Sequence, residues 1–115
     1  VDHLRHPAFE SCPGHEFFKR DFSASNGLFS FVLKEGNLKS VTALVENMHH
    51  FKMGFSWGGF ESLILGVFGL DKIRTVTEWD SSKPLIRLHI GLENPDDLIT
   101  DLEAGFERFN AVLGK

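Results

Sequence analysis

The chain has 115 residues, of which 42% are hydrophobic, and this favours one globular domain, residues 1–115, that buries roughly two thirds of its unfolded surface. The net charge of -4 and the absence of a Lys/Arg stripe argue against nucleic acid as a partner. No apolar run approaches the roughly 20 residues of a membrane helix, so no membrane partner is expected. The single Cys12 cannot form an internal disulfide, which suits a cytoplasmic location. The start at Val1, not Met, favours a piece of a longer protein.

The first half of the chain predicts an extended initial segment, one strand and two helices. Expected in order are an extended segment over residues 1–7, a loop over 9–14, a helix over 15–22, a strand over 28–33 and a helix over 38–49. Apolar residues at every second position support the strand. In the second helix they recur at helical spacing, as Leu38, Val41, Leu44, Val45 and Met48.

The second half predicts three strands and one well-marked helix. The strands are expected over residues 53–56, 63–67 and 85–91, with an irregular surface loop and one helical turn over 71–83. The last helix begins after Asn94, a good N-cap, with Pro95 at its first position. Its apolar residues Leu98, Leu102, Phe106 and Phe109 fall on one face.

This order of elements predicts the fold class. After an irregular initial segment it is β-α-β-β-β-α, which indicates an α+β fold, a two-layer α/β sandwich. We expect a small, mostly antiparallel sheet with helices on one face.

Arg87 is the first candidate for a binding role. Strand alternation places Ile86, Leu88 and Ile90 on one face and Leu85, Arg87 and His89 on the other. A guanidinium is permanently charged, so its burial requires an anion. Arg87 therefore faces solvent, forms a salt bridge, or holds the carboxylate or phosphate of a ligand. The available protein anions for a salt bridge are Glu61, Glu78 and Asp80.

Ser56, Trp57, Gly58 and Gly59 are the second candidate group. Two consecutive glycines between strands most often permit a hairpin turn with positive φ. Alternatively, they let a ligand or another backbone approach closely. Trp57 then offers one indole N–H on an apolar plate, and Ser56 a hydroxyl.

The histidines do not indicate a metal site. His49 and His50 are expected to be neighbours on a helix and to point apart, and His3 and His6 lack a third ligand. His89 shares the strand face of Arg87, where a structural role is more common than catalysis. No residue pattern forms a self-contained catalytic apparatus.

Four segments resemble, in order, the C-terminal domain of the pyridoxal-phosphate (PLP) enzymes of cysteine and methionine metabolism. They are GHEFFKRDFSASNGLFSF (14–31), SWGGFES (56–62), LIRLHIGLE (85–93) and NPDDLITDLEAGFERF (94–109). The resemblance implies the small domain of a fold-type I PLP enzyme. Other members usually carry Leu at Trp57 and Ser at His89, so both departures favour the β-lyase branch.

The resemblance also implies roles for individual residues. Arg87 would bind the α-carboxylate of an amino-acid substrate, assisted by the Trp57 indole N–H and the Ser56 backbone N–H. The Ser56 hydroxyl would lie near a catalytic lysine. For His89, Glu61 and the Gly58-Gly59 pair, the resemblance implies only that they support this wall of the substrate site.

The implied reaction is carbon–sulfur β-elimination, in which PLP acts as the electron sink. In the family the catalytic lysine, the phosphate site and a ring-stacking tyrosine belong to an N-terminal PLP domain absent from this sequence. None of the lysines here has the expected context, and there is no tyrosine. We therefore expect no catalytic residue in this chain, no bound PLP and no activity for it alone. The intact enzyme is expected to be a cytoplasmic homotetramer.

Three alternatives remain open. The first is the same domain of a γ-lyase or γ-synthase, with the same fold and cofactor. The second is a stand-alone amino-acid-binding module that uses Arg87, since fold alone does not imply function. The third is a purely structural subunit, which no feature of the sequence supports.

Overall fold

The computed structural model describes residues 1–115 and contains one five-stranded sheet and four helices. The strands are β1 (His3–Arg5), β2 (Leu28–Val32), β3 (Lys52–Met53), β4 (Leu63–Val67) and β5 (Leu85–His89). The helices are α1 (His15–Asp21), α2 (Leu38–Val45), α3 (Leu70–Ile73) and α4 (Pro95–Leu113).

The strand order is β1-β2-β5-β4-β3, so β5 lies in the centre of the sheet. β5 is antiparallel to both of its neighbours, β2 and β4, and β1 is antiparallel to β2. Only the short edge strand β3 runs parallel to its neighbour, β4. The predicted α+β fold with a mostly antiparallel sheet is confirmed.

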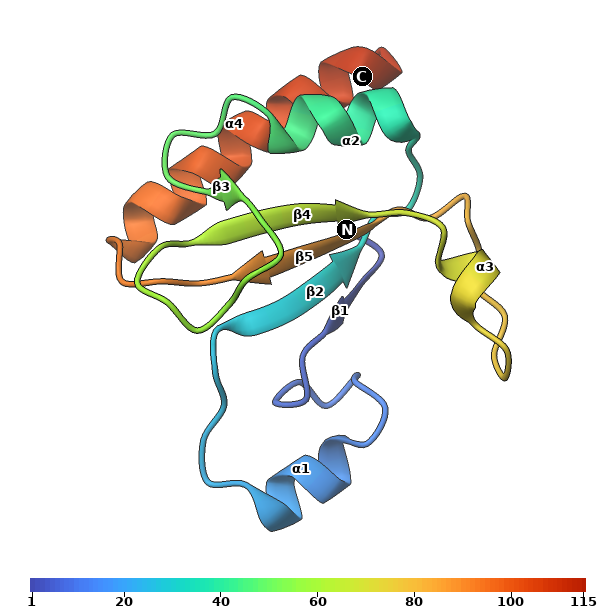
Figure 1. The fold of residues 1–115 in the computed structure, drawn as a ribbon, viewed down its shortest axis with the longest axis vertical. Coiled ribbons are helices and arrows are strands. Elements are labelled where there is room, and N and C mark those ends of the chain that lie inside the picture. The colour runs from blue at the N-terminus through green and yellow to red at the C-terminus, as the bar shows by residue number, and fades with distance from the viewer.

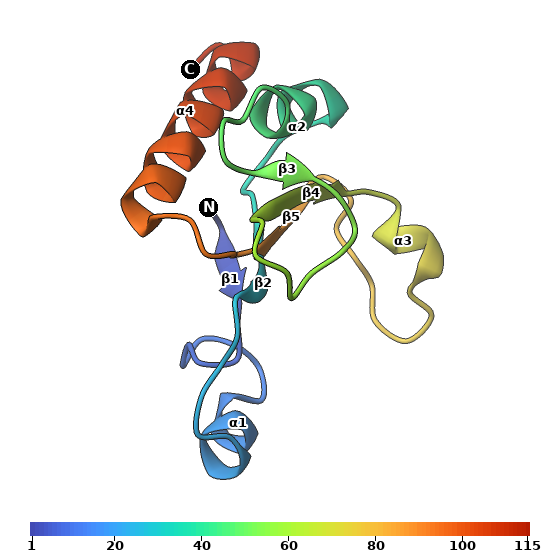
Figure 2. The ribbon, with the colours of Figure 1, turned by 60° about the vertical axis from the view of Figure 1, so that its left-hand side comes forward.

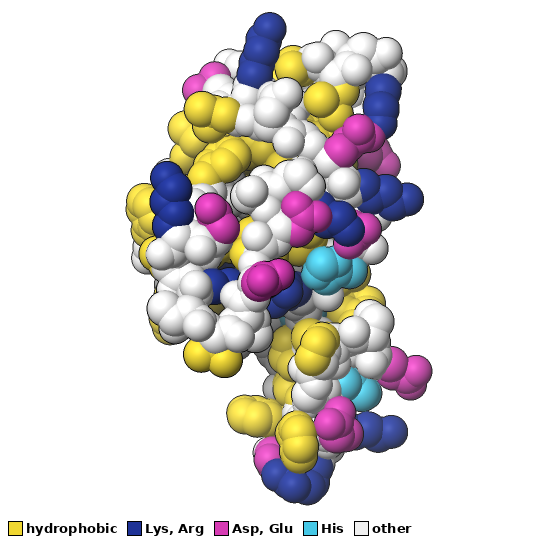
Figure 3. All heavy atoms as spheres, turned by 90° about the vertical axis from the view of Figure 1, so that its right-hand side faces the viewer, with side chains coloured by type: hydrophobic (Ala, Val, Ile, Leu, Met, Phe, Trp, Pro, Cys, Tyr) yellow, Lys and Arg dark blue, Asp and Glu magenta, His cyan; other side chains and the backbone are white.

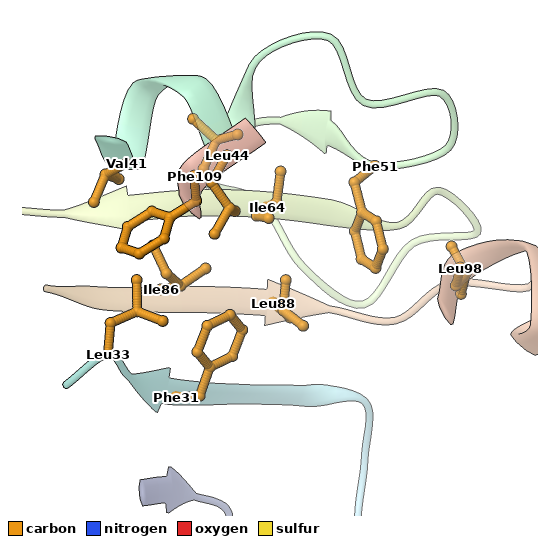
Figure 4. Close-up of a cluster of buried hydrophobic side chains, with 11 residues drawn as sticks. Phe31, Leu33, Val41, Leu44, Phe51, Ile64, Ile86, Leu88, Leu98 and Phe109 are labelled. Carbon is orange, nitrogen blue, oxygen red and sulfur yellow. The ribbon is translucent and has the colours of Figure 1, made fainter. Parts of the chain in front are cut away.

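Helices α2 and α4 lie side by side and cover one face of the sheet (Figure 1; Figure 2). The core lies between these two layers (Figure 4). Ile64, Ile86 and Leu88 supply its sheet side and are at most 1% exposed. Leu44 from α2 and Phe109 from α4 supply its helix side. The predicted apolar faces of β5 and α4 are thus confirmed.

Helix α1 lies away from this sandwich, in a lobe beyond the ends of β1 and β2 (Figure 1). No residue of α1 is buried. The lobe exposes aromatic side chains, with Phe17 56% and Phe22 64% exposed, and hydrophobic side chains are visible on it at the bottom of Figure 3. The predicted helix is therefore present, but it contributes nothing to the core.

The helix expected over 38–49 is four residues too long. Helix α2 ends at Val45, Glu46 is extended, and Asn47 adopts a left-handed φ of 61°. The backbone N–H groups of the following residues, His49, His50 and Phe51, donate to the Asp101 carboxylate of α4. This distant carboxylate replaces the helical hydrogen bonds. His49 and His50 therefore follow the helix and do not lie on it.

The connection at Gly58-Gly59 is not a hairpin. Because β3 and β4 are parallel, the chain must return along the sheet between them, and it does so through residues 54–62. The strand expected over 53–56 is correspondingly shorter and consists of Lys52–Met53 alone. Gly58 does have a positive φ, 80°, as a turn with glycine predicts.

Candidate functional site

The candidate site is formed by the face of β5 that points away from α2 and α4. We call residues 54–62, which cross this face between β3 and β4, the site loop. Every second residue from 87 to 93 contacts the site loop. Arg87, His89 and Glu93 do so through their side chains, and Gly91 through its backbone N–H. The LIRLHIGLE segment thus contributes one face to the core and the other to the site.

Arg87 holds the first part of the site loop. Its Nη2 donates to the backbone carbonyls of Gly54, at 3.3 Å, and of Phe55 and Ser56. No carboxylate lies within salt-bridge distance of the guanidinium, so the alternative of a salt bridge is wrong. The Nε and Nη1 groups donate to no group of the chain. A half-buried cation with unused donors is therefore left available to an anion.

Ser56 and Trp57 lie beside Arg87 along the site loop. The Ser56 carbonyl oxygen is 3.5 Å from the Arg87 Nη2. Neither the Ser56 N–H and hydroxyl nor the Trp57 indole N–H is hydrogen-bonded within the chain, and the Trp57 side chain is 63% exposed. The structure brings Ser56 to the guanidinium and places Trp57 next in the chain, but their contact with a carboxylate stays a prediction.

His89 holds the turn of the site loop. Its Nδ1 accepts from the Gly58 N–H at 3.3 Å, and its Nε2 donates to the Gly59 carbonyl at 2.9 Å. Since an N–H can only donate and a carbonyl only accept, the imidazole is the neutral tautomer with the proton on Nε2. The ring is 7% exposed, in register with Leu28 and Leu63 on the neighbouring strands.

Ser62 and Glu93 hold the end of the site loop and were not expected from the sequence. The Glu93 carboxylate accepts from the Ser62 N–H and hydroxyl, both at 2.7 Å, and the Ser62 Oγ accepts from the Gly91 N–H at 2.8 Å. Burial raises the pKa of the Glu93 carboxyl, but the hydrogen bonds from Ser62 lower it by a larger amount. This pKa therefore lies below its usual value. The continued alternation beyond His89 was the available signal for Glu93.

Gly91 allows the backbone of the site loop to approach β5. A Cβ at this position would lie 2.1 Å from the Phe60 carbonyl oxygen, which cannot be accommodated without movement of the loop. That carbonyl accepts from the Leu92 N–H at 2.9 Å. Glu61, in contrast, is exposed and forms no hydrogen bond within the chain, so the structure provides no basis for its expected supporting role.

Asp101 acts outside the site but determines how the chain enters it. The carboxylate is 3% exposed and accepts three backbone N–H groups, at 2.8, 2.8 and 3.1 Å, just before β3. Burial raises the pKa of the Asp101 carboxyl, but these hydrogen bonds outweigh burial and lower the pKa below its usual value. Its partners are about fifty residues away in sequence, so no local pattern predicted them.

The residues of the site fit an anion and not an aldehyde cofactor. PLP is held through a lysine and a phosphate-binding group, and no lysine takes part in the hydrogen bonds around Arg87 and His89. The chain also contains no tyrosine to stack on the cofactor ring. There is also no group of three or more His, Cys, Asp or Glu residues that could hold a metal ion.

Comparison with known proteins identifies the family of this chain. Residues 1–107 match the family described as Cys/Met metabolism PLP-dependent enzyme. The chain belongs to this family. The resemblance inferred from the four sequence segments is thereby confirmed, and PLP is the cofactor of the full-length enzymes of the family.

Curated relatives in this PLP-dependent family include cystathionine beta-lyases. The chain is 52% identical over 111 residues to that of Escherichia coli (strain K12), covering 94% of this chain and 28% of the relative. It is equally 52% identical, with the same coverage, to the cystathionine beta-lyase of Haemophilus influenzae. The chain thus spans little more than a quarter of the length of these relatives.

Solved structures of the family share the fold. The cystathionine gamma synthase from Xanthomonas oryzae pv. oryzae in complex with cystathionine superposes with a TM-score of 0.77 at 30% identity. The match covers 96% of this chain and 30% of that one. In the present structure no helix has both the length and the apolar character required to cross a membrane.

Proposed function

We propose that this chain is the substrate-carboxylate-binding domain of a cystathionine β-lyase, which cleaves L-cystathionine by β-elimination to homocysteine, pyruvate and ammonia. Arg87 binds the α-carboxylate, and the Ser56 N–H and Trp57 indole N–H assist. The observation that carries this proposal is the half-buried Arg87 guanidinium, which has no acidic partner in the chain and retains unbonded Nε and Nη1 donors.

The donors around Arg87 have the chemistry of a carboxylate site. A guanidinium grips a carboxylate through two parallel hydrogen bonds, and further N–H donors fix the position of its oxygens. The unbonded donors of Ser56 and Trp57 lie on the same loop as the carbonyls that orient the Arg87 Nη2. The site loop therefore carries the further N–H donors that a carboxylate site of this kind requires.

The chemistry of elimination is assigned to the rest of the enzyme. Phe55, Trp57 and Phe60 of the site loop are 78%, 63% and 70% exposed, so the site has one wall and is open on the other side. We propose that a further domain supplies PLP, the catalytic lysine and the second wall. The 115-residue chain alone is then inactive. Stable visible absorbance of bound PLP in this chain alone would contradict this part of the proposal.

The test of the proposal is the kinetics of the full-length enzyme on L-cystathionine. Arg87→Ala should lower kcat/KM by about 30-fold or more, because loss of one partner of a desolvated charge pair costs about 2–5 kcal/mol. Arg87→Lys should be nearly as damaging, since an ammonium cannot make two parallel bonds. Arg20→Ala, an exposed arginine of α1, is the matched control. An unchanged kcat/KM in Arg87→Ala would overturn the proposed role of Arg87.

A second candidate is a γ-synthase or γ-lyase, favoured by the structural similarity to a cystathionine gamma synthase. The products distinguish the two, because β-elimination releases pyruvate and γ-elimination releases 2-oxobutyrate. The higher identity to cystathionine beta-lyases, 52%, favours pyruvate.

A stand-alone amino-acid-binding module remains the alternative from another class. Its site would need to enclose the ligand, whereas Trp57 and its neighbours are open to solvent. Calorimetric titration of the chain with methionine or cysteine tests this. Micromolar binding would favour the module over the enzyme domain.

A further inference from the structure

Trp57 lies between two separately held parts of the site loop. On one side Arg87 binds the carbonyls of residues 54–56, and on the other His89 binds Gly58 and Gly59. Trp57 itself forms no hydrogen bond within the chain. The position of its backbone, from which the indole extends, therefore depends on how firmly these two flanks are held.

His89 provides the only hydrogen bonds that residues 57–59 make within the chain. A Cβ built on Gly58 or Gly59 would have no neighbour within 4 Å, so the turn is open on the side where a side chain would stand. The hydrogen bonds that tie the turn to β5 are those of the two imidazole nitrogens.

The imidazole is rigidly held. It is 7% exposed and belongs to the central strand, between Leu28 of β2 and Leu63 of β4. A neutral ring can accept at one nitrogen and donate at the other, and His89 does both with adjacent peptide groups of the turn. No charged group is needed for these two contacts.

We propose that His89 is a positioning residue that fixes the Gly58-Gly59 turn and thereby holds Trp57 beside Arg87 to bind the substrate carboxylate. This inference rests on the proposed function and extends it to a residue that touches neither substrate nor cofactor. Arg87 supplies the charge, and His89 sets where the neighbouring indole donor stands. Loss of His89 then weakens substrate binding more than the chemical step.

The stability cost of removing His89 is expected to be small. Gly58 and Gly59 are exposed, so water can replace both hydrogen bonds. In His89→Leu an apolar side chain takes the same buried position on β5, in register with Leu28 and Leu63. His89→Gln restores one acceptor and one donor at the end of a side chain of similar reach.

The test compares KM and kcat for L-cystathionine in the full-length enzyme. We expect His89→Leu to raise KM about tenfold, the equivalent of one lost positioning interaction, with kcat within about twofold of wild type. His89→Gln should recover most of the loss. His49→Leu is the matched control, because the His49 side chain is exposed and forms no hydrogen bond.

A second pair of variants tests the turn without changing β5. Gly58→Ala strains a residue with φ 80°, whereas Gly69→Ala strains one with φ 72° at the start of α3, and neither has a neighbour within 4 Å. KM should rise in Gly58→Ala and stay unchanged in Gly69→Ala. This pair decides the question if His89→Leu fails to fold.

The outcomes separate the positioning role from the proposed function. If Arg87→Ala raises KM but His89→Leu and Gly58→Ala do not, the positioning role is overturned and the carboxylate site stands. If His89→Leu lowers kcat with KM unchanged, the positioning role is likewise overturned. If Arg87→Ala itself has no effect, both the proposed function and this inference are overturned.

Discussion

The two faces of the sheet are held by different forces. On the face toward α2 and α4, apolar side chains such as Ile86 and Leu88 exclude water almost completely. On the opposite face, Arg87, His89 and Glu93 hold the site loop through hydrogen bonds to its backbone. The apolar face makes the fold stable, and the polar face orients a loop while the Nε and Nη1 donors of Arg87 stay unbonded within the chain.

Removal of an apolar side chain from the covered face should have the largest effect on stability. Leu44 is 0% exposed and packs between α2 and the sheet, so Leu44→Ala should lower the free energy of unfolding by about 3–4 kcal/mol. Leu38→Ala is the matched control, since Leu38 lies on the same helix but is 65% exposed. Urea unfolding measures both variants. Equal losses would contradict the assignment of the core.

Removal of the Asp101 carboxylate charge should have the next largest effect. Asp101→Asn leaves at least one buried N–H without its acceptor, which costs about 2 kcal/mol at neutral pH. Glu103→Gln, an exposed change on the same helix, is the control. A loss in Glu103→Gln as large as in Asp101→Asn would contradict the role of Asp101.

The pH dependence of this loss has a defined sign. The pKa of Asp101 is lowered in the folded state from its ordinary value of 3.8, so its contribution to stability is complete above the unfolded-state pKa. It is lost as the pH falls through the folded-state value. The difference between wild type and Asp101→Asn should therefore shrink below about pH 4. A difference that is constant from pH 7 to pH 3 would contradict this linkage.

Displacement of the site loop should cost less stability than these changes. In Gly91→Ala the new methyl group must push the Phe60 carbonyl away, at a cost of about 1–2 kcal/mol. Gly59→Ala is the control, because no atom lies within 4 Å of its new Cβ. Thermal unfolding compares them, and hydrogen exchange of the Leu92 N–H, bonded to Phe60, should accelerate in Gly91→Ala alone. Unchanged exchange would show that the loop does not depend on this contact.

A fully exposed polar contact should contribute least. Arg20 and Asp21 form two short hydrogen bonds on α1, at 2.7 and 2.8 Å, but solvent surrounds both side chains. Exposed ion pairs are weak because water and salt screen them. The melting temperature of Arg20→Ala should match that of wild type, and a clear decrease would show that α1 supports the fold.

Elements marked by local signals could be predicted from the sequence. Helix α4 begins at Pro95 after the Asn94 cap, and β4 spans Leu63–Val67, both as expected. The alternation in LIRLHIGLE correctly separated the core face from the face of Arg87 and His89. These predictions rest on contacts within one element, which spacing alone determines.

Features that depend on distant partners could not be predicted. The end of α2 at Val45 depends on Asp101, and the short parallel strand β3 depends on its pairing with β4. The contacts of His89 with Gly58 and Gly59 span some thirty residues. Sequence spacing placed Arg87 and His89 on one face of β5, but it indicated neither Ser62 and Glu93 nor the backbone groups that these side chains hold.

The strand order also determines when the sheet can form during protein synthesis. β5 lies between β2 and β4, and those two strands form no hydrogen bonds with each other. As the chain leaves the ribosome, the edges of β2 and β4 that pair with β5 therefore stay unpaired until residues 85–89 emerge. Unpaired edges and exposed apolar surface are sites of misassociation and chaperone binding. The segment that carries Arg87 thus also completes the sheet, so no nascent chain can display the site before this sheet has closed.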